Sequence, residues 1–404
     1  MRVLLVNAYA KSGGASVAAR RLCAALNGAG AEARLLVQNA EGAEDACLLR
    51  TRDRWAGRRP SGDALPTLFW RNRRSPHWGN AWIGNAATRK SIRGFSPDVT
   101  HLHWINHGML SLCDVARLKG PVVWTLHDSW AFTGGCHSPQ DCAKFRERCG
   151  GCPELKSRRD RDLSRWNWNR KRAAWAQADF TVVAPSRWLA DMAKSSSLLA
   201  GKRIETIPNA VDTAIFRPMD RAWARREMGL PENAPVFLFA AHGAATDWNK
   251  GMDLWRAALA AVAREYPGAV AALAGAPAGS LPLPVHELGT LSPERLAMAM
   301  AAADATVVPS RMENLPNVVA ESLACGTPVA AFAVGGIPEM IRPGETGFLA
   351  QPHDPADLAR GICELLARGG GMRAACAAFA RETYAPETVA RRHLDLYRSL
   401  LESP

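Results

Sequence analysis

The fold of this chain is decided by one stretch, residues 310–329, which reads Ser310-Arg311-Met312-Glu313-Asn314-Leu315-Pro316-Asn317-Val318-Val319-Ala320-Glu321-Ser322-Leu323-Ala324-Cys325-Gly326-Thr327-Pro328-Val329. The apolar run just before it, 305–308, predicts a strand, and a loop then leads to a helix predicted at 317–324. A Gly-Thr-Pro triplet ends that helix, and the next apolar run, 329–332, predicts a second strand. Two short strands joined by a helix are typical of a parallel β-sheet.

The same alternation of strands and helices extends outward from this stretch over most of the chain. In the second half, strands are predicted at 236–240, 269–273, 286–289, 305–308, 329–332 and 347–350, and helices at 251–265, 293–302 and 317–324. In the first half, strands are predicted at 3–6, 33–37, 98–104, 122–126, 180–183 and 203–207, and a helix at 15–26. Strands separated by helices imply parallel pairing, so the predicted fold class is α/β, with two doubly wound, Rossmann-like domains.

The boundary between the two predicted domains falls where the alternation pauses. Residues 208–218 begin and end with proline and contain an Asn-Ala-Val-Asp turn. We therefore predict a first domain at 1–207, a second at 208–383, and a C-terminal helix at 384–404 that packs back on the first domain. Because parallel sheets bind ligands beyond the carboxyl ends of their strands, we expect the domains to face each other across a cleft that holds the functional site.

Length and composition exclude several other classes of protein. The chain has 404 residues, of which 48% are hydrophobic and 22% are charged, as in soluble globular proteins. These values exclude a disordered chain, a collagen-like fibre and a small disulfide scaffold. No apolar run reaches the length of about 18 residues that a membrane-spanning helix needs, and the first residues lack the pattern of a signal peptide. We therefore expect a cytoplasmic protein.

The positive charge of the chain is concentrated in two segments. Lys and Arg number 50 against 38 Asp and Glu, a net charge of +12. Residues 50–74 and 156–172 each hold eight basic and two acidic residues, and tryptophans lie within 50–82 and 156–172. Basic residues mixed with Trp suit an anionic membrane surface, at the inner face of the membrane, or a phosphate-bearing partner. The alternative is a solvated basic face with Trp partly buried beneath it. No nucleic-acid-binding motif is present, so we expect no nucleic-acid partner.

The loop and helix at 310–329 carry groups suited to a phosphorylated ligand. Amides at the start of the predicted helix suit a phosphate or diphosphate. Glu313 in the loop and Glu321 in the helix are placed to address different hydroxyls of one extended ligand. The simpler alternatives are a helix-surface acid for Glu321 and a loop acid that caps the helix for Glu313. Gly335 and Gly336 begin a second glycine loop, which we expect to open onto another helix.

These motifs resemble those of the retaining glycosyltransferases of family GT4, which adopt the GT-B fold. The resemblance rests on Glu313-x7-Glu321, the Ala-Cys-Gly-Thr-Pro-Val that follows, and Gly335-Gly-x-Pro-Glu339, and it extends over nearly the whole chain. The Glu-Asn-Leu-Pro-Asn form of the motif is similar to that found in the branch of the family that acts in bacterial capsular and exopolysaccharide synthesis. The resemblance implies a transferase without a catalytic metal that moves a sugar from a UDP- or GDP-sugar to a hydroxyl of a glycan or a lipid-diphosphate-linked acceptor, with retention of configuration.

The resemblance also implies roles for particular residues. Glu313 would bind the donor sugar hydroxyls, Glu321 the ribose, and Lys250 the donor diphosphate, while His127 would lie near the reacting carbon. The remaining residues expected to bind the donor are Asn314, Leu315, Pro316, Gly13, Gly14, Gly243, Gly335 and Gly336. The simpler alternatives are a surface lysine for Lys250 and a core or surface residue for His127. Asp128 would either orient His127 or begin the next loop. We expect His101 and His103 to be structural.

One position departs from the family pattern. Many members place an Arg after a Gly shortly before the lysine, where it contacts the diphosphate, but this chain reads Ala240-Ala241-His242-Gly243-Ala244-Ala245. Either His242 or an Arg from elsewhere in the chain, such as Arg311, replaces that Arg, or diphosphate binding is weaker. If diphosphate binding is weaker, an alternative function is that of a partner protein that binds a nucleotide or glycan without catalysis. A nucleotide-sugar 2-epimerase, which also uses paired GT-B domains, is a further alternative.

Four of the ten cysteines crowd into one loop at 136–152, namely Cys136, Cys142, Cys149 and Cys152. The Cys-Gly-Gly-Cys spacing of the last two is typical of a thiolate zinc site, and a structural zinc would stabilise a loop that has no core of its own. Free or redox-active thiols and disulfides are the alternatives. Four thiolates fill a tetrahedral site, so we do not expect a catalytic metal here. The other six cysteines are predicted to be small core residues.

Overall fold

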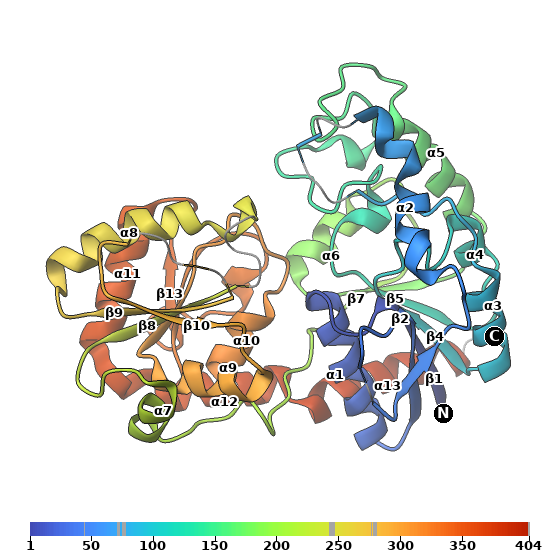
Figure 1. Ribbon diagram of the computed structural model, residues 1–404. Helices are drawn as coiled ribbons and strands as arrows, with labels where there is room; N and C mark the ends of the chain where they lie inside the picture. The colour runs from blue at the N-terminus through green and yellow to red at the C-terminus, as the bar shows by residue number, and fades with distance from the viewer. Residues whose placement is uncertain are drawn as a thin grey trace. The chain divides into compact units, whose positions relative to one another are not determined.

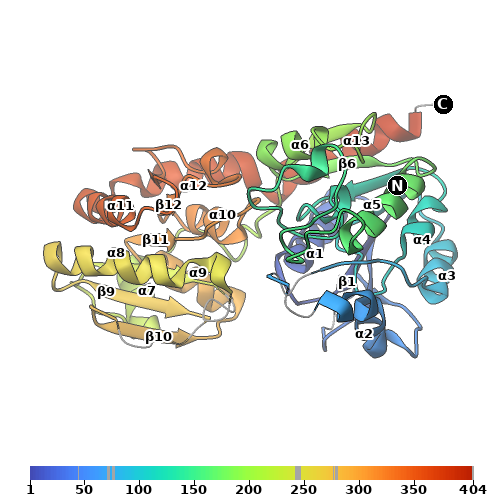
Figure 2. The same ribbon diagram turned by 90° about the horizontal axis from the view of Figure 1, so that it is seen from above.

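The computed structural model describes residues 1–43, 45–70, 73–74, 78–241, 247–275, 277 and 281–402. The chain divides into two compact units (Figure 1). Unit 1 comprises Met1–Asn209 together with Val389–Pro404, and unit 2 comprises Ala210–Thr388. Most of the last helix, α13 (Pro386–Glu402), therefore belongs to unit 1, and Figure 2 shows it lying along that unit.

The described part of unit 1 contains a seven-stranded sheet with strand order β3-β2-β1-β4-β5-β6-β7. The strands are β1 (Arg2–Tyr9), β2 (Glu32–Asn39), β3 (Leu48–Arg50), β4 (Val99–Leu102), β5 (Val122–Thr125), β6 (Thr181–Ala184) and β7 (Ile204–Thr206). Neighbouring strands pair in parallel. The α-helices of this unit besides α13 are α1 (Gly14–Gly28), α2 (Arg59–Ala64), α3 (Ala86–Phe95), α4 (Leu112–Ala116), α5 (Leu163–Trp175) and α6 (Arg187–Lys194).

Unit 2, over its described residues, contains a six-stranded parallel sheet with strand order β10-β9-β8-β11-β12-β13. The strands are β8 (Val236–Ala240), β9 (Val270–Ala274), β10 (Val285–Gly289), β11 (Ala305–Val308), β12 (Val329–Phe332) and β13 (Gly347–Ala350). The α-helices are α7 (Arg221–Met228), α8 (Met252–Glu265), α9 (Pro293–Ala302), α10 (Asn317–Ala324), α11 (Pro355–Arg368) and α12 (Arg373–Tyr384).

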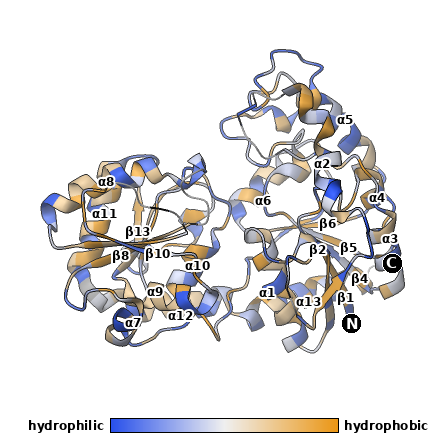
Figure 3. Ribbon diagram, viewed as in Figure 1, coloured by the Kyte–Doolittle hydropathy of each residue, from blue (hydrophilic) through white to orange (hydrophobic). Residues whose placement is uncertain are grey.

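Burial explains why the strands are short apolar runs rather than alternating ones. All four residues of β5 and of β11 are buried, because helices cover both faces of a parallel sheet. Figure 3 shows the strands mostly in the hydrophobic colour and many of the connecting loops in the hydrophilic one. The predicted fold class, two doubly wound α/β domains of the GT-B type, is confirmed.

Three local features differ from what the sequence pattern indicated. The segment Leu48–Arg50 forms the edge strand β3, which the sequence pattern did not indicate. The strand predicted at 98–104 ends at Leu102, because the chain leaves the sheet there. The glycine loop at 335–336 opens onto a single 3₁₀ turn, η6 (Ile337–Glu339), instead of an α-helix, and its role in binding an anion stays a prediction.

Strand order locates the point in each sheet where ligands bind. In unit 1 the chain moves outward from β1 through β2 to β3, and then returns to continue from β4 on the other side of β1. In unit 2 the same reversal separates β8 from β11. Open α/β sheets bind ligands beyond the carboxyl ends of the strands at such a reversal. We therefore expect the ligand-binding residues of unit 1 to follow β1, β4 and β5, and those of unit 2 to follow β8 and β11.

Candidate functional site

In unit 2, Lys250 and Glu313 meet beyond the carboxyl ends of β8 and β11. The Lys250 ammonium donates to Glu313 Oε1 over 2.8 Å. The two side chains are 29% and 16% exposed, so the pair is partly shielded from water. The negative charge of Glu313 raises the pKa of Lys250, which keeps the ammonium charged at neutral pH. The arrangement offers a fixed cation beside a fixed anion, as the binding of a diphosphate and of sugar hydroxyls requires.

Two glycines fix the backbone around this pair. Gly251 adopts φ +68°, and a Cβ placed there would lie 1.9 Å from the Pro309 carbonyl oxygen. Gly335 adopts φ +57°, and its Cβ would lie 1.8 Å from the carbonyl oxygen of Glu313. The next amide, that of Gly336, donates to the same Glu313 oxygen over 3.0 Å. The glycine loop therefore holds the Glu313 backbone in place.

Side-chain and backbone hydrogen bonds join the loop after β8 to the loop after β11. Asn249 Nδ2 donates to the Met312 carbonyl over 2.7 Å, and the Arg311 amide donates to the Asn249 carbonyl over 2.8 Å. These bonds place Lys250, which adjoins Asn249, opposite Glu313. The structure therefore brings together two residues that the sequence proposed separately.

Glu321 is buried on α10, with 6% of its surface exposed. The alternative of a helix-surface acid is therefore wrong. Glu313 does not occupy the N-cap position of α10, which is Pro316, and its carboxylate accepts from Lys250 instead. Leu315 is buried beside this helix start.

Arg311 is already bound within unit 2. Its guanidinium donates to both carboxylate oxygens of Asp253, over 2.9 and 2.6 Å, and stacks over the Trp248 ring at 4.3 Å. This geometry does not support Arg311 as the replacement for the missing family arginine. The other candidate, His242, and the predicted donor-binding residue Gly243 both lie outside the described residues.

In unit 1, the turn after β1 leads directly into α1. Gly13 is the N-cap of α1 with φ +83°, a conformation that favours glycine, and Gly14 is the first helical residue. Both glycines are exposed, as is Ser12 before them. The helix start is therefore exposed, and donor binding at Gly13 and Gly14 stays a prediction.

His127 follows β5 and is hydrogen-bonded to His103, which follows β4. His127 Nε2 and His103 Nδ1 are 2.9 Å apart. Burial lowers the pKa of His127 to about 4 and that of His103 well below its usual value, so both rings are neutral at neutral pH. A neutral His127 can exchange hydrogen bonds with a bound sugar. Its pKa is too low for an efficient general base near pH 7.

Asp128 binds the loop that follows it. Its carboxylate accepts hydrogen bonds from His137 Nδ1 at 2.6 Å and from the Trp130 amide at 2.8 Å. Of the two roles expected for Asp128, this geometry favours the one in the loop. His137 lies beside Cys136, so Asp128 also anchors the start of the cysteine loop.

Sequence reasoning missed a group of half-buried aromatic side chains at this edge of unit 1. Tyr9 Oη and His107 Nδ1 are 2.7 Å apart, and Trp104 packs edge-on against His107 with ring centroids at 4.6 Å. His137 lies nearly parallel to Trp104, with centroids at 5.9 Å. Aromatic faces of this kind suit the apolar face of a sugar ring. Their positions in the sequence could have indicated this group, since Tyr9 ends β1 and Trp104 closely follows β4.

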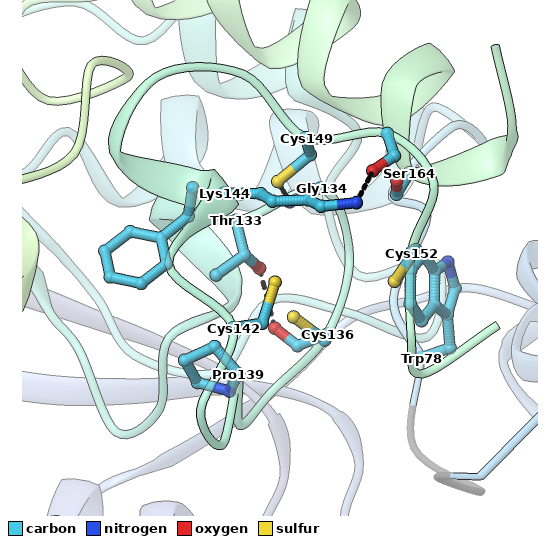
Figure 4. A pocket seen from close by; sticks show the side chains of 12 residues that line it. Trp78, Thr133, Gly134, Cys136, Pro139, Cys142, Lys144, Cys149, Cys152 and Ser164 are labelled. Carbon is cyan, nitrogen blue, oxygen red and sulfur yellow. Dashed lines mark hydrogen bonds between the residues drawn. The ribbon is translucent and has the colours of Figure 1, made fainter. Parts of the chain in front are cut away.

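The four cysteines of the loop line one small cavity of about 20 Å³ (Figure 4). Cys149 Sγ accepts a hydrogen bond from the Gly134 amide over 3.2 Å. Burial raises the pKa of the Cys149 thiol to about 12 and that of Cys152 to about 11. Within the described residues, no three side chains of His, Cys, Asp or Glu are grouped so that they could hold one metal ion. The structural zinc at these four cysteines stays a prediction.

A buried lysine accompanies this cavity. The Lys171 side chain is fully buried, and its ammonium donates to the carbonyls of Trp130 and Thr133. Burial lowers the pKa of Lys171 to about 7, against the opposing effect of Cys136 and Cys149. Lys171 is thus a core residue, although it belongs to the basic run at 156–172.

Comparison with known proteins places the chain in a family. A family model described as Glycosyltransferase Family 4 matches residues 12–215, which is just over half of the chain. The chain belongs to glycosyltransferase family 4. A second model, described as Glycosyl transferases group 1, matches residues 234–368. The family assignment covers the glycine turn and His127, and the second match covers Lys250, Glu313 and Glu321.

Named relatives share the sequence over part of their length. The chain is 31% identical over 292 residues to D-inositol 3-phosphate glycosyltransferase from Acidothermus cellulolyticus, covering 67% of this chain and 60% of that protein. It is also 31% identical over 317 residues to the protein of that name from Geodermatophilus obscurus. That match covers 72% of this chain and 65% of that protein. The chain thus matches about three fifths of the length of these relatives.

Solved structures share the fold at lower identity. Sucrose-phosphate synthase from Thermosynechococcus elongatus has a TM-score of 0.71 and 20% identity, covering 99% of this chain and 98% of that chain. Anabaena Alr3699/HepE, solved in complex with UDP-glucose, has a TM-score of 0.65 and 18% identity, covering 99% and 100%. In the part of the chain that the structure describes, no helix is long and apolar enough to cross a membrane.

Proposed function

We propose that this chain transfers a sugar from a nucleotide-diphosphate donor to a hydroxyl group of an acceptor. The observation that carries the proposal is the Lys250–Glu313 pair at the strand reversal of unit 2, with Glu321 buried on the next helix. Membership of family 4 supports the reaction class, and the UDP-glucose bound by Anabaena Alr3699/HepE supports a UDP-sugar as the first donor to test.

Each donor-binding residue then has a distinct task. The Lys250 ammonium faces the diphosphate and stabilises the negative charge that develops on it as the sugar leaves. Glu313 accepts hydrogen bonds from the sugar hydroxyls, and Glu321 binds the ribose. We propose that these groups and backbone amides act without a catalytic metal.

The proposed transfer retains the configuration at the anomeric carbon. The bond between that carbon and the diphosphate oxygen breaks, and the acceptor hydroxyl oxygen forms its bond on the same face. The proton of that hydroxyl passes to the leaving phosphate oxygen. Neutral His127 holds the donor sugar by a hydrogen bond and takes no proton in this scheme.

We propose that the acceptor is a glycan or a lipid-diphosphate-linked glycan of a bacterial surface polysaccharide. The aromatic side chains of Trp104, His107 and His137 give unit 1 a surface suited to a sugar ring. A second candidate acceptor is an inositol phosphate, which the names of the 31% identical relatives favour. Such an acceptor would also be a ring that carries several hydroxyls.

A basic surface of unit 1 supports an acceptor at the membrane. We define the basic tryptophan surface by its exposed apolar side chains, which are Trp55, Leu65, Leu68, Phe69, Trp82 and Trp166. The guanidiniums of Arg54 and Arg58 stack on Trp55, each at 5.4 Å, and that of Arg170 stacks on Trp166 at 4.4 Å. Arg170 also donates to the Ala81 carbonyl over 3.2 Å, which joins α5 to the chain next to Trp82. We propose that this surface rests on an anionic membrane.

Thermal unfolding with UDP, GDP, ADP and dTDP tests the donor site first. A nucleotide at 100 times its Kd stabilises the protein by about 2.7 kcal/mol, and Glu321→Ala should abolish that shift. Donors that carry the matching base are then offered with glycan, lipid-linked and inositol phosphate acceptors. A nucleotide shift without transfer to any acceptor would support a binding protein instead. A change in the donor sugar without any acceptor would support an epimerase.

A further inference from the structure

Asp128 and His137 form a hydrogen-bonded pair beyond the carboxyl end of β5. Asp128 Oδ2 lies 2.6 Å from His137 Nδ1, and the two side chains are 24% and 14% exposed. Backbone amides hold both residues as well. The Trp130 amide donates to Asp128 Oδ1 over 2.8 Å, and the Ser129 amide donates to the His137 carbonyl over 3.1 Å. The two carboxylate oxygens of Asp128 therefore have different, fixed partners.

This arrangement determines which nitrogen of His137 carries the proton. Burial opposes the ionisation of Asp128, but His137 and the Trp130 amide hold the pKa of that carboxyl below its usual value, so it is a carboxylate at neutral pH. A carboxylate only accepts hydrogen bonds, so His137 Nδ1 is the donor. A neutral imidazole has one N–H. Neutral His137 therefore has its lone pair on Nε2.

The Nε2 atom of His137 is open to solvent. Within the described part of the chain, this atom forms no hydrogen bond with the protein, and it is not one of the buried side-chain atoms that lack a partner. A ligand can therefore reach it. The anchoring of the cysteine loop needs only the Nδ1 side of the ring, so Nε2 is available for another contact.

An aromatic ring of fixed position lies beside this nitrogen-bearing ring. His137 and Trp104 have ring centroids 5.9 Å apart and planes 28° apart. Trp104 is held in turn by its amide, which donates to Asn7 Oδ1 over 2.9 Å. Binding sites for small molecules combine aromatic surface with a few directed polar atoms. The pair of Trp104 and His137 has both features.

We propose that His137 binds the acceptor, with Nε2 accepting a hydrogen bond from a hydroxyl group of its ring, and that Asp128 is the positioning residue that keeps Nε2 free of a proton. The proposal rests on the function proposed above and deepens it. A ring hydroxyl is preferred over a phosphate at this position. Phosphate oxygens are themselves acceptors, and the Asp128 carboxylate behind the ring repels their charge.

The first test reads the proton positions directly in the whole protein. Nitrogen-15 NMR of histidine-labelled protein at pH 8 should show His137 protonated at Nδ1 and unprotonated at Nε2. A proton on Nε2 at this pH would overturn the proposal. The measurement needs no substrate, so its outcome is independent of whether sugar transfer is found.

Asp128→Asn should reverse these proton positions. The new side-chain oxygen can still accept from the Trp130 amide at the Oδ1 position, so the new NH₂ group faces His137 Nδ1 and donates to it. The His137 proton then moves to Nε2. His101 is the internal control, because its Nδ1 is 2.5 Å from Tyr397 Oη and its Nε2 is 2.7 Å from Thr125 Oγ1. Its resonances should stay in place, and a His137 unchanged by the substitution would show that Asp128 does not position it.

The second test separates acceptor binding from a structural role. In His137→Asn the new amide nitrogen can donate to Asp128 in place of Nδ1, but nothing replaces Nε2. With the donor and acceptor found for the unmodified protein, kcat/KM for the acceptor should fall about three- to tenfold, the range of one ordinary hydrogen bond. The donor KM and the thermal midpoint should change little.

His286→Asn is the matched control, because His286 is a half-buried histidine on β10, the edge strand of unit 2. It should leave kcat/KM for the acceptor unchanged. A lower midpoint of His137→Asn with unchanged kcat/KM would show that His137 only anchors the cysteine loop. Lack of transfer by the unmodified protein would instead refute the proposed function.

Discussion

Lys250 and Glu313 are 63 residues apart in the sequence, yet the ammonium of one lies 2.8 Å from the carboxylate of the other. The pair exists because β8 and β11 are neighbours at the strand reversal of unit 2, so the loops that follow them meet. Charged groups held in fixed positions before the substrate arrives stabilise a transition state without having to reorganise.

Removal of the Lys250 charge should weaken catalysis more than stability. Lys250→Met should lower kcat by about 10²–10³, the cost of losing one preorganised charge-stabilising group. Lys194→Met is the control, because Lys194 forms an exposed pair with Asp191 on α6. Steady-state kinetics with the matching nucleotide sugar measures both variants. Equal kcat in the two variants would show that Lys250 does not face the developing charge.

Gly335→Ala should destabilise unit 2 and disturb Glu313. The new Cβ would lie 1.8 Å from the Glu313 carbonyl oxygen, and the backbone is at φ +57°. We expect a loss of about 1–3 kcal/mol in the free energy of unfolding, measured with urea. Gly268→Ala is the control, because nothing lies within 4 Å of its Cβ and its φ is not positive. Similar losses in both variants would contradict the assigned role of the loop.

Lys171 should make stability rise with pH from about pH 7 upward. Its folded pKa of about 7 lies below its ordinary value of 10.5, so the unfolded chain binds more protons between these values. Stability increases with pH wherever the unfolded state binds more protons. Above pH 9 the buried cysteines lower the free energy of unfolding, because their pKa values are higher in the folded chain than in the unfolded chain. Urea unfolding from pH 6 to 9 should show a slope that Lys171→Met reduces, and an unchanged slope would contradict this assignment.

The buried thiols Cys149 and Cys152 of the cysteine loop should resist alkylation. Thiols react as thiolates, and burial raises the pKa of Cys149 and Cys152 well above neutral. Iodoacetamide at pH 8 should therefore modify the exposed Cys113 first, as mass spectrometry of peptides would show. Metal analysis of the same protein gives a second check. One zinc per chain would confirm the predicted structural site, and a protein without zinc would contradict it.

The basic tryptophan surface should bind anionic vesicles at low salt. We expect sedimentation with vesicles containing phosphatidylglycerol, loss of binding at high salt, and no binding to neutral vesicles. Phe69→Ser, which changes an 87% exposed side chain, should weaken binding. Trp223→Ser is the control, because Trp223 is an exposed tryptophan on the basic helix α7 of unit 2. Equal loss in the two variants would locate binding elsewhere.

Local signals explain which elements the sequence could predict. The predicted bounds of α9 and α10 agree with the structure. Helix α9 begins after Ser292, whose side chain caps it, with Pro293 in the first turn, and Gly326 follows the end of α10. Strand β3 was missed because its three residues form an edge with no apolar alternation.

The candidate site was only partly predictable, because proximity depends on strand order. The Glu313 and Glu321 motif is local and can be found in the sequence. The meeting of Tyr9 with His107 depends on the pairing of β1 with β4, which no local pattern encodes.

The burial of Lys171 was not predictable either, because the basic run at 156–172 indicates exposed charge. The burial of Lys171 follows instead from the face of α5 that packs inward.

The contact between Tyr397 and His101 has a consequence for the order of synthesis. Unit 1 is discontinuous, since its last helical residues come from Val389 onward, whereas unit 2 is one continuous segment. On the ribosome, unit 2 is fully translated before the final residues of unit 1 leave the exit tunnel. Domains generally fold as units during translation. The nascent chain must therefore leave the His101 side of its first sheet uncovered until α13 has been translated.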